Sequence, residues 1–449
     1  MHLFKHARVP LACLPTPLNE PTGAPGAEIE PWRECDIAVE GNRIVSVKDS
    51  SSTSDGSTFF STKVTDLGGQ LVFPGLLEVH THLDKCHTWD RSPGVHSDFW
   101  ESLHILGADS ANWSEEDVYR RADFALRTAW AHGTNALRSH IDTGRKFAAG
   151  GGGYPAVNRL RDEWKGKIEI QTVSLINFSE FFSGGADYAI ATAAKYKATA
   201  MGGFPQPNPD IAKQMDYVMA AARELGVGLD LHVDESALVE AECLRATAEA
   251  VLRNQFPYPV ACGHNCSLSV QAPERAAETI ALIKEAGIGI ISLPLTNLHL
   301  QGRARGPAPS KGGFGQPRTP QWRGLTLIHE CIDAGITVAC GGDNVRDAFI
   351  GWGDFDMVEV YVESVRLAHL DTRLATSPAV VTTGPAKIMG LPGYGMIAPG
   401  SPADMIVFPL KKLYSLLARP YTPRRFVRGE EFREAQLPDY AEMDPWPKA

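Results

Sequence analysis

Hydrophobic residues along the middle of the chain follow one repeated pattern. Between about residues 71 and 390, short apolar runs alternate with stretches in which apolar residues recur every three or four positions. We count eight runs, which read LVFPGLLEVHTH, TNALRSHID, IEIQTVSLI, KATAMGGFP, GLDLHVDE, PVACGHNC, GIGIISLPL and TVACGGDN. Continuous apolar strands that alternate with helices indicate a parallel sheet with both faces buried. Eight strand–helix units predict an α/β fold, the (β/α)₈ or TIM barrel.

The stretch between the first two runs illustrates the helical pattern. It reads WSEEDVYRRADFALRTAWAHG, and Ser114 with Asp117 forms a capping-box signature at its start. Apolar residues then recur at helical spacing, at Val118, Ala122, Ala125 and Leu126. We therefore expect an amphipathic helix here.

The two ends of the chain share a different pattern. Short β-type runs such as CDIAVEGNRIVSV, PGSPADMIVFPL and RRFVRGEEF lie among turns, and Gly41–Asn42 is a hairpin signal. Together with the pattern of the middle segment, this pattern predicts that the 449 residues form two domains. A small β-sandwich domain is expected from residues 1–70 plus 391–449, and the barrel from residues 71–390.

Composition narrows the classes of partner. The formal net charge is −10, which argues against nucleic acid or an anionic membrane as a partner, because both require basic patches. No apolar run approaches the roughly 18–20 residues of a membrane span. Lys5, Arg8 and Pro10 interrupt the first residues, which lack the apolar core of a secretory signal. Eight cysteines are too sparse for a disulfide scaffold, so a cytoplasmic location is expected.

Polar side chains stand at the ends of several predicted strands. The first run ends in His80-Thr81-His82, whose two histidines share one strand face. The fifth, sixth and eighth runs end in His232, His264 and Asp343. Catalytic residues of a barrel gather at the carboxyl ends of its strands, and histidine with aspartate suits Zn²⁺ or Fe²⁺. A structural role is the expectation for five other histidines, which do not stand at the end of a predicted strand: His87, His96, His104, His132 and His329.

Longer motifs carry a resemblance to a known family. The string from Pro74 to Lys85, PGLLEVHTHLDK, resembles the opening strand of the amidohydrolase superfamily. The strings HVDE, GHNCSLS and LPLTNLHLQGR look like its cytosine deaminase branch, which includes N-isopropylammelide hydrolases. The resemblance extends to the C-terminal GMIAPGSPADMIVF and so covers most of the chain.

The resemblance implies a set of site residues. It implies one divalent ion per chain, Zn²⁺ or Fe²⁺, and a metal-bound hydroxide that attacks a ring carbon. Glu235 resembles the proton shuttle, His264 the residue that steadies the developing oxyanion, and Asp343 accepts a proton from the water. The fourth run has no lysine at its end, which implies a mononuclear site. The implied metal ligands are His80, His82, His232 and Asp343.

Four further residues are implied to contact the substrate. Asn344 follows the eighth-strand ligand, where cytosine deaminases have an acidic residue, and the form DNVRD looks more like the aminotriazine-hydrolysing relatives. Asn177 stands where cytosine deaminases carry a ring-binding glutamine. Gln301 and Arg303 belong to NLHLQGR, which is kept as in cytosine deaminases. The following segment, Gly302–Pro320, either covers the substrate or is a connector without a role.

These observations favour one function and keep alternatives open. The first hypothesis is a cytosine-deaminase-type enzyme that hydrolyses an amino group from a small nitrogen heterocycle. The first alternative is a hydrolase of an N-alkyl aminotriazine or another cyclic amide or amidine. A binuclear amidase or lactonase of the same fold would need a bridging Lys or Glu, and an inactive scaffold would normally lack ligands. A homo-oligomer is expected by analogy alone.

Overall fold

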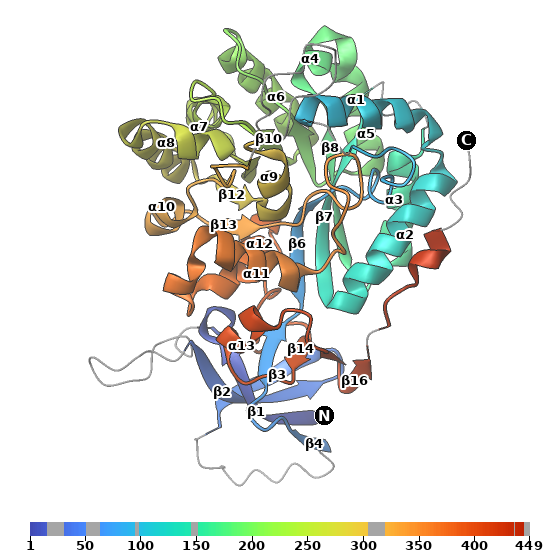
Figure 1. The fold of residues 1–449 in the computed structure, drawn as a ribbon, viewed down its shortest axis with the longest axis vertical. Coiled ribbons are helices and arrows are strands. Elements are labelled where there is room, and N and C mark those ends of the chain that lie inside the picture. The colour runs from blue at the N-terminus through green and yellow to red at the C-terminus, as the bar shows by residue number, and fades with distance from the viewer. Residues whose placement is uncertain are drawn as a thin grey trace. The chain divides into compact units, whose positions relative to one another are not determined.

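The computed structural model describes residues 1–15, 31–50, 63–94, 98–144, 151–303, 319–434 and 436–443 (Figure 1). Most of the segment 302–320, for which two roles are predicted, lies outside this part of the chain. The chain divides into two compact units, and the residues predicted to bind the metal all belong to the second. The first unit comprises Met1–Glu78, Thr128–Ala136 and Asp356–Leu437, and the second comprises Val79–Arg127, Leu137–Phe355 and Pro438–Ala449. The predicted domain boundaries stay a prediction.

Eight strands form the barrel sheet, and each follows the previous one in both sequence and space. They are β6 (Leu76–Thr81), β7 (Thr134–Asp142), β8 (Glu169–Leu175), β9 (Ala200–Gly203), β10 (Gly228–Val233), β11 (Val260–His264), β12 (Gly289–Ser292) and β13 (Val338–Cys340). A parallel bridge between Thr81 and Asp343 joins the last strand region to the first. The backbone N–H of Asp343 donates to the carbonyl of His80 over 2.8 Å, so the ring of strands is closed. The predicted barrel is confirmed.

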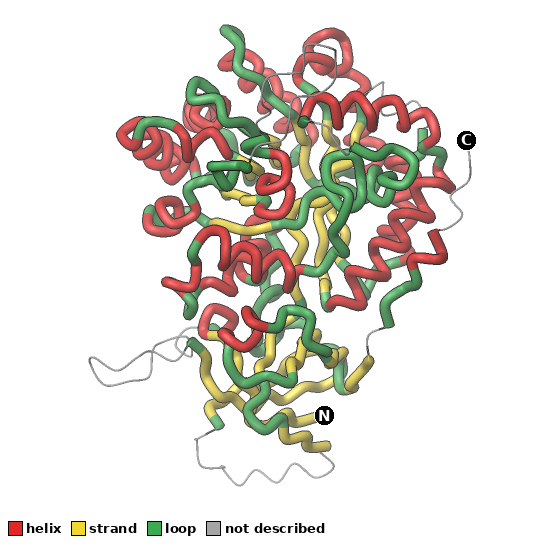
Figure 2. Tube along the Cα trace, viewed as in Figure 1, coloured by secondary structure: helices red, strands yellow, loops and turns green. Residues whose placement is uncertain are grey.

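Helices lie outside the strands of the barrel, as Figure 2 shows. The helices of this unit are α1 (Phe99–Asp109), α3 (Gly153–Glu163), α4 (Phe178–Glu180), α5 (Ala186–Tyr196), α6 (Ile211–Leu225), α7 (Cys243–Asn254), α8 (Pro273–Ala286), α9 (Pro294–Leu300), α10 (Ile328–Asp333) and most of α2 (Glu115–His132). The strands β7, β10 and β11 are buried along almost their whole length. This burial on both faces explains why their sequences are nearly continuous apolar runs.

The predicted helix after the first strand is α2. Its start is capped by Ser114, whose Oγ accepts a hydrogen bond from the backbone N–H of Asp117 over 3.2 Å. This bond satisfies one of the donors left free at a helix start. The four apolar positions that predicted the helix are fully buried: Val118, Ala122, Ala125 and Leu126.

A second sheet is built from both ends of the chain. Its strands are β1 (His2–Pro10), β2 (Trp32–Glu40), β3 (Arg43–Asp49), β4 (Lys63–Asp66), β5 (Leu71–Pro74), β14 (Asp404–Phe408), β15 (Arg425–Arg428) and β16 (Glu431–Glu434). Strands β2 and β3 form the predicted hairpin, with Glu40 opposite Arg43 and Gly41 at a φ of 59° in the turn. Apolar residues from both ends, including Phe4, Ile37 and Met405, share one core. The prediction of a small β domain from both termini is confirmed.

The remaining helices of the first unit are α11 (Met357–Ala368), α12 (Thr383–Met389) and α13 (Leu413–Ala418). No helix in the described part of the chain is long and apolar enough to cross a bilayer.

Candidate metal centre and active site

Three histidine rings and one carboxylate meet at the carboxyl ends of the barrel strands. The Nε2 atom of His232 lies 3.2 Å from Nε2 of His80 and 3.3 Å from Nε2 of His82. The Nε2 atom of His82 lies 3.1 Å from Oδ1 of Asp343. Each of the four side chains brings one ligand atom within 4.8 Å of the others. The strand-end residues predicted from the sequence therefore come together in space.

The chemistry of these donors fits a divalent cation. Burial lowers the pKa of His80, His82 and His232, so neutral imidazoles face one another at this point. Burial alone would raise the pKa of Asp343, but the hydrogen bond with His82 holds it below the ordinary value. Neutral imidazole nitrogens and an ionised carboxylate are the form in which these residues bind Zn²⁺ or Fe²⁺. The four side chains could therefore hold such an ion.

The backbone around the cluster is specialised. Gly263 on β11 lies against His80, and a Cβ atom there would be 3.0 Å from Cε1 of that ring. His264 and Asp343 have φ values of 67° and 64°, in the left-handed region that non-glycine residues rarely occupy. Such strain is concentrated at functional sites, where the surrounding structure holds it in place.

Glu235 and His264 form a second group beside the cluster. Oε1 of Glu235 lies 3.2 Å from Nδ1 of His264, and the amide nitrogen of Asn297 lies 3.1 Å from both atoms. Burial raises the pKa of Glu235. Burial opposes the charge on His264, but the carboxylate of Glu235 outweighs it and raises the pKa of His264. Glu235, His264 and Asp343 again bring one atom each within 4.8 Å, so an acid–base pair adjoins the cluster.

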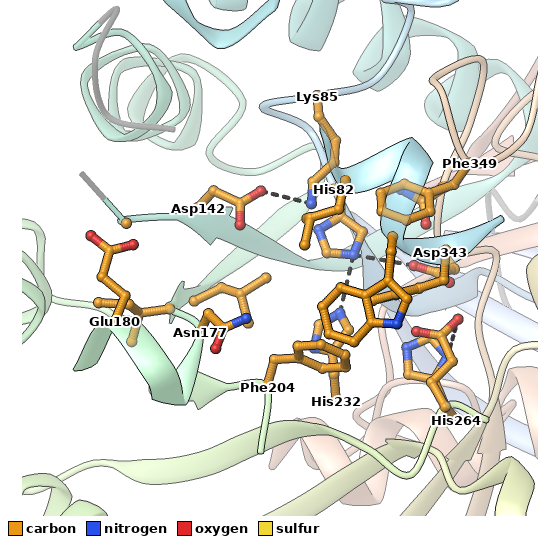
Figure 3. A pocket seen from close by; sticks show the side chains of 18 of the residues that line it. His82, Lys85, Asp142, Asn177, Glu180, Phe204, His232, His264, Asp343 and Phe349 are labelled. Atoms are coloured by element: carbon orange, nitrogen blue, oxygen red, sulfur yellow. Dashed lines mark hydrogen bonds and ion pairs between the residues drawn. The ribbon is translucent and has the colours of Figure 1, made fainter. Parts of the chain in front are cut away.

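One cavity of about 330 Å³ is lined by His82, His232 and Asp343 of the cluster and by both Glu235 and His264 (Figure 3). Its wall includes three phenylalanines, with the ring of Phe99 5.0 Å from that of Phe204 and 5.5 Å from that of Phe349. Lys85 and Asp142 also line the cavity and form an ion pair of 2.7 Å. The cavity thus offers aromatic faces together with a few charged groups, as small-molecule sites do.

Comparisons with known proteins identify the family. A model described as "Amidohydrolase family" matches residues 109–424. This chain belongs to the amidohydrolase family. The resemblance predicted from the motifs is confirmed, and with it the assignment to the hydrolases.

Individual amidohydrolases are similar over nearly the whole chain. A pterin deaminase of Rhizobium rhizogenes strain K84 is 38% identical over 443 residues, which cover 98% of this chain and 96% of the relative. An N-isopropylammelide isopropyl amidohydrolase of Pseudomonas sp. strain ADP is 23% identical and covers 83% and 86%. The solved structure of a 5-methylcytosine deaminase from Klebsiella pneumoniae matches with a TM-score of 0.77 at 19% identity, covering 98% and 99%. This last similarity shows the fold.

The four residues predicted to bind substrate lie in different settings. Asn177 and Asn344 line the cavity. The carbonyl oxygen of the Asn177 side chain accepts from the backbone N–H of Ser179, and the Asn344 amide donates to Asp347 over 2.6 Å.

Gln301 and Arg303 are not among the described residues that line this cavity. The side chain of Gln301 donates to the backbone carbonyl of Glu235 over 3.3 Å, and Nε of Arg303 donates to the backbone carbonyl of His299 over 2.7 Å. The substrate contacts of all four residues stay predictions.

Sequence reasoning missed several residues of the site. Lys85 stands three residues after His82. Asp142 ends the second predicted strand, so its position at a strand end could have identified Asp142 as a site residue. His104 was expected to be structural, but it lines the cavity. His140, two residues before Asp142, has its ring 4.1 Å from that of His80 and carried no motif.

Proposed function

We propose that the protein is a mononuclear metal-dependent deaminase that hydrolyses an exocyclic amino group from a bicyclic nitrogen heterocycle of the pterin type. The observation that carries this proposal is the four-residue cluster, three members of which line the same cavity as the Glu235–His264 pair. Similarity to pterin deaminase along 98% of the chain supports the substrate class. A cytoplasmic location and a homo-oligomeric state stay predictions.

His80, His82, His232 and Asp343 would hold the ion, Zn²⁺ or Fe²⁺. A divalent ion at such ligands lowers the pKa of water and so supplies the nucleophile near neutral pH. A second group, His80, His140 and Asp230, also brings three ligand atoms together. Asp230 is already paired with Arg138 over 2.8 Å, which compensates its charge. This pairing supports one ion per chain.

Asp343 of the cluster and Glu235 beside it would carry out different proton transfers. Asp343 would accept a proton from the attacking water, and Glu235 would donate one to the ring nitrogen next to the attacked carbon. Glu235, now ionised, would take up the second proton of the added water from the new hydroxyl group and pass it to the departing amine, and the proton held by Asp343 would restore Glu235. In the overall reaction, the oxygen of water replaces the amino group on the ring carbon as C=O, and the amino group leaves as ammonia.

His264 would stabilise the charge that develops on the attacking oxygen. Its Nδ1 is engaged by Glu235 and Asn297, whereas its Nε2 has no hydrogen-bond partner among the described residues. An N–H at Nε2 is therefore available to the oxyanion. Preorganised donors of this kind act strongly in a site that excludes water.

The aromatic side chains in the cavity wall favour a flat aromatic substrate. Phe99, Phe204 and Phe349 present ring faces and edges on which a fused heterocycle can stack. A cavity of about 330 Å³ lies at the small end of the usual range for ligand sites, about 300–1,000 Å³, and suits a bicyclic ring without large substituents.

An ammonia-release assay tests the proposal. The enzyme is loaded separately with Zn²⁺, Fe²⁺ or Mn²⁺ and incubated with pterin, cytosine, isocytosine, creatinine or ammelide-type triazines. We expect the highest kcat/KM with pterin. A preference for cytosine, or no turnover of pterin with any metal, would contradict the substrate assignment.

Hydrolysis of an N-alkyl aminotriazine is the second candidate. Asn344, which follows Asp343 as in the triazine-hydrolysing relatives, lines the cavity, and the N-isopropylammelide hydrolase is 23% identical. Alkylamine released from N-isopropylammelide, measured by chromatography, would favour this candidate if its kcat/KM exceeds that of pterin.

A further inference from the structure

The cavity contains a buried ion pair that the proposed proton transfers do not use. Nζ of Lys85 lies 2.7 Å from Oδ2 of Asp142, and their side chains are 5% and 10% exposed. Both line the cavity that contains His82, Glu235 and Asp343. Burial removes water from both charges, and their mutual attraction must first offset that cost, so such a pair is weak evidence for a role in stability.

The local backbone is anchored independently of this pair. The backbone N–H of Asp142 donates to Oδ2 of Asp84 over 2.7 Å. On the other side, the N–H of Leu83 donates to Ser139 Oγ over 2.9 Å, and the N–H of Cys86 donates to the carbonyl of His82 over 3.2 Å. The chain on both sides is therefore positioned without the contact between Lys85 and Asp142.

The pair and the acid–base group flank the candidate ligands. In Figure 3, Lys85 and Asp142 lie on one side of His82, and Asp343 and His264 lie on the other. Glu235 is paired with His264. The Lys85–Asp142 pair and His264, the partner of Glu235, therefore lie on different sides of His82.

We propose that a flat substrate ring lies over His82 with one edge toward Glu235, and that Lys85 and Asp142 bind its opposite edge. There they recognise an N–H group and a hydrogen-bond acceptor on neighbouring ring positions. Lys85 donates to a carbonyl oxygen or ring nitrogen, and Asp142 accepts from the adjacent ring N–H. In a 2-amino-4-oxo ring whose N1 receives the proton from Glu235, this edge is the lactam, N3–H beside C4=O. The inference rests on the proposed function and adds that the substrate must have a lactam on this edge.

The position of the aromatic side chains agrees with this arrangement. Nζ of Lys85 lies 5.8 Å from the centre of the Phe349 ring, so an aromatic face adjoins the charged edge of the cavity. A ring stacked between aromatic side chains can move within its plane. Polar groups on two opposite edges would fix its register and place the carbon that carries the amino group over the candidate ligands.

Binding of two ligands that differ at one atom tests the inference. Pterin and 3-methylpterin, which lacks the N3–H, are titrated into two metal-loaded proteins, with tryptophan fluorescence as the readout. Both carry Glu235→Gln, so that pterin is not consumed; one is otherwise wild type, and the other has the double change Lys85→Met/Asp142→Ala. We expect the otherwise wild-type protein to bind pterin about 10- to 100-fold more tightly than 3-methylpterin, the range for hydrogen bonds to charged groups. The double variant should bind both ligands with similar affinity.

Control variants separate this role from a structural one. Arg91 forms ion pairs with Asp117 and Asp109, at 2.6 Å and 2.9 Å, and is not among the described lining residues. Arg91→Met should keep the wild-type ratio of affinities. If the double variant does not fold, as judged by thermal unfolding, the neutral Asp142→Asn variant is titrated in its place, and a reduced ratio is expected.

The possible results decide the inference separately from the proposed function. A folded variant with normal metal content and an unchanged affinity ratio would overturn the lactam-reading role, even if the wild type deaminates pterin. Equal wild-type affinity for both ligands would do the same. Absence of turnover together with the expected affinity ratio would contradict the proposed reaction and leave the lactam-reading role supported.

Discussion

At the scale of single residues, the site depends on the protonation state that each environment favours. Burial keeps the three imidazoles of the cluster neutral, and the hydrogen bond with His82 keeps Asp343 ionised. Only a few ångströms away, burial favours the protonated form of Glu235. Two carboxyl groups with opposite preferences are what a site needs in order to accept one proton and donate another.

Glu235→Gln tests the shuttle. Glutamine keeps the size of the side chain but cannot transfer a proton, so we expect kcat to fall by about 10²–10⁴-fold, while one equivalent of metal stays bound. Steady-state kinetics and elemental analysis of the same sample measure both quantities. Activity close to the wild-type value would exclude Glu235 as the shuttle.

Asp343→Ala tests the ligand assignment. Loss of the only carboxylate in the cluster should lower the metal content and the rate together, because the three remaining ligands are neutral. Metal content per chain is measured after dialysis against a weak chelator. A variant that keeps the wild-type content of metal would show that Asp343 is not a ligand.

At the scale of secondary-structure elements, strand β11 combines two roles. It contributes His264 at its end, and Gly263 gives the ring of His80 the space that it needs. The barrel therefore positions a candidate ligand of one strand by means of a glycine, which has no side chain, on another strand.

Gly263→Ala tests this close approach. An added methyl group 3.0 Å from the His80 ring must displace the ring, and overpacking of this kind costs about 1–3 kcal/mol. We expect weaker metal affinity in a competition titration with a chromophoric chelator. The matched control is Ala261→Gly on the same strand, which should lower the thermal midpoint without changing metal affinity. Equal affinity in the Gly263→Ala variant and the wild type would contradict the argument.

At the scale of the whole molecule, the candidate centre ties together strands that are distant in sequence. His80 and His82 come from the end of β6, His232 from β10, and Asp343 follows β13. An ion held by all of them stabilises the folded barrel, because the unfolded chain cannot gather the ligands.

Removal of the metal should therefore lower both activity and stability. After treatment with a chelator we expect turnover to cease and the thermal midpoint to fall, and both should return when Zn²⁺ or Fe²⁺ is added. Calorimetry of the apo and reconstituted protein measures the shift. An apo protein with the same midpoint as the reconstituted one would argue against an ion that bridges these strands.

Much of the architecture could be predicted from the sequence, because each signal is local. Alternating apolar runs predicted the barrel strands, and the Ser114 cap and the Gly41–Asn42 turn predicted a helix start and a hairpin, all of which the structure contains. The residues of the candidate ligand cluster could also be predicted. They stand at strand ends, and parallel strands bring these ends to one rim.

The contacts between these residues and the rest of the site became visible only in the folded barrel. Lys85 and Asp142 are 57 positions apart in the chain (142 minus 85), and nothing in the local pattern around either residue predicts an ion pair inside the cavity. The same holds for Asn297, which reaches both Glu235 and His264. Local spacing determines strands, helices and their ends, whereas contacts between side chains from different strands, loops and helices depend on how the closed barrel orients them.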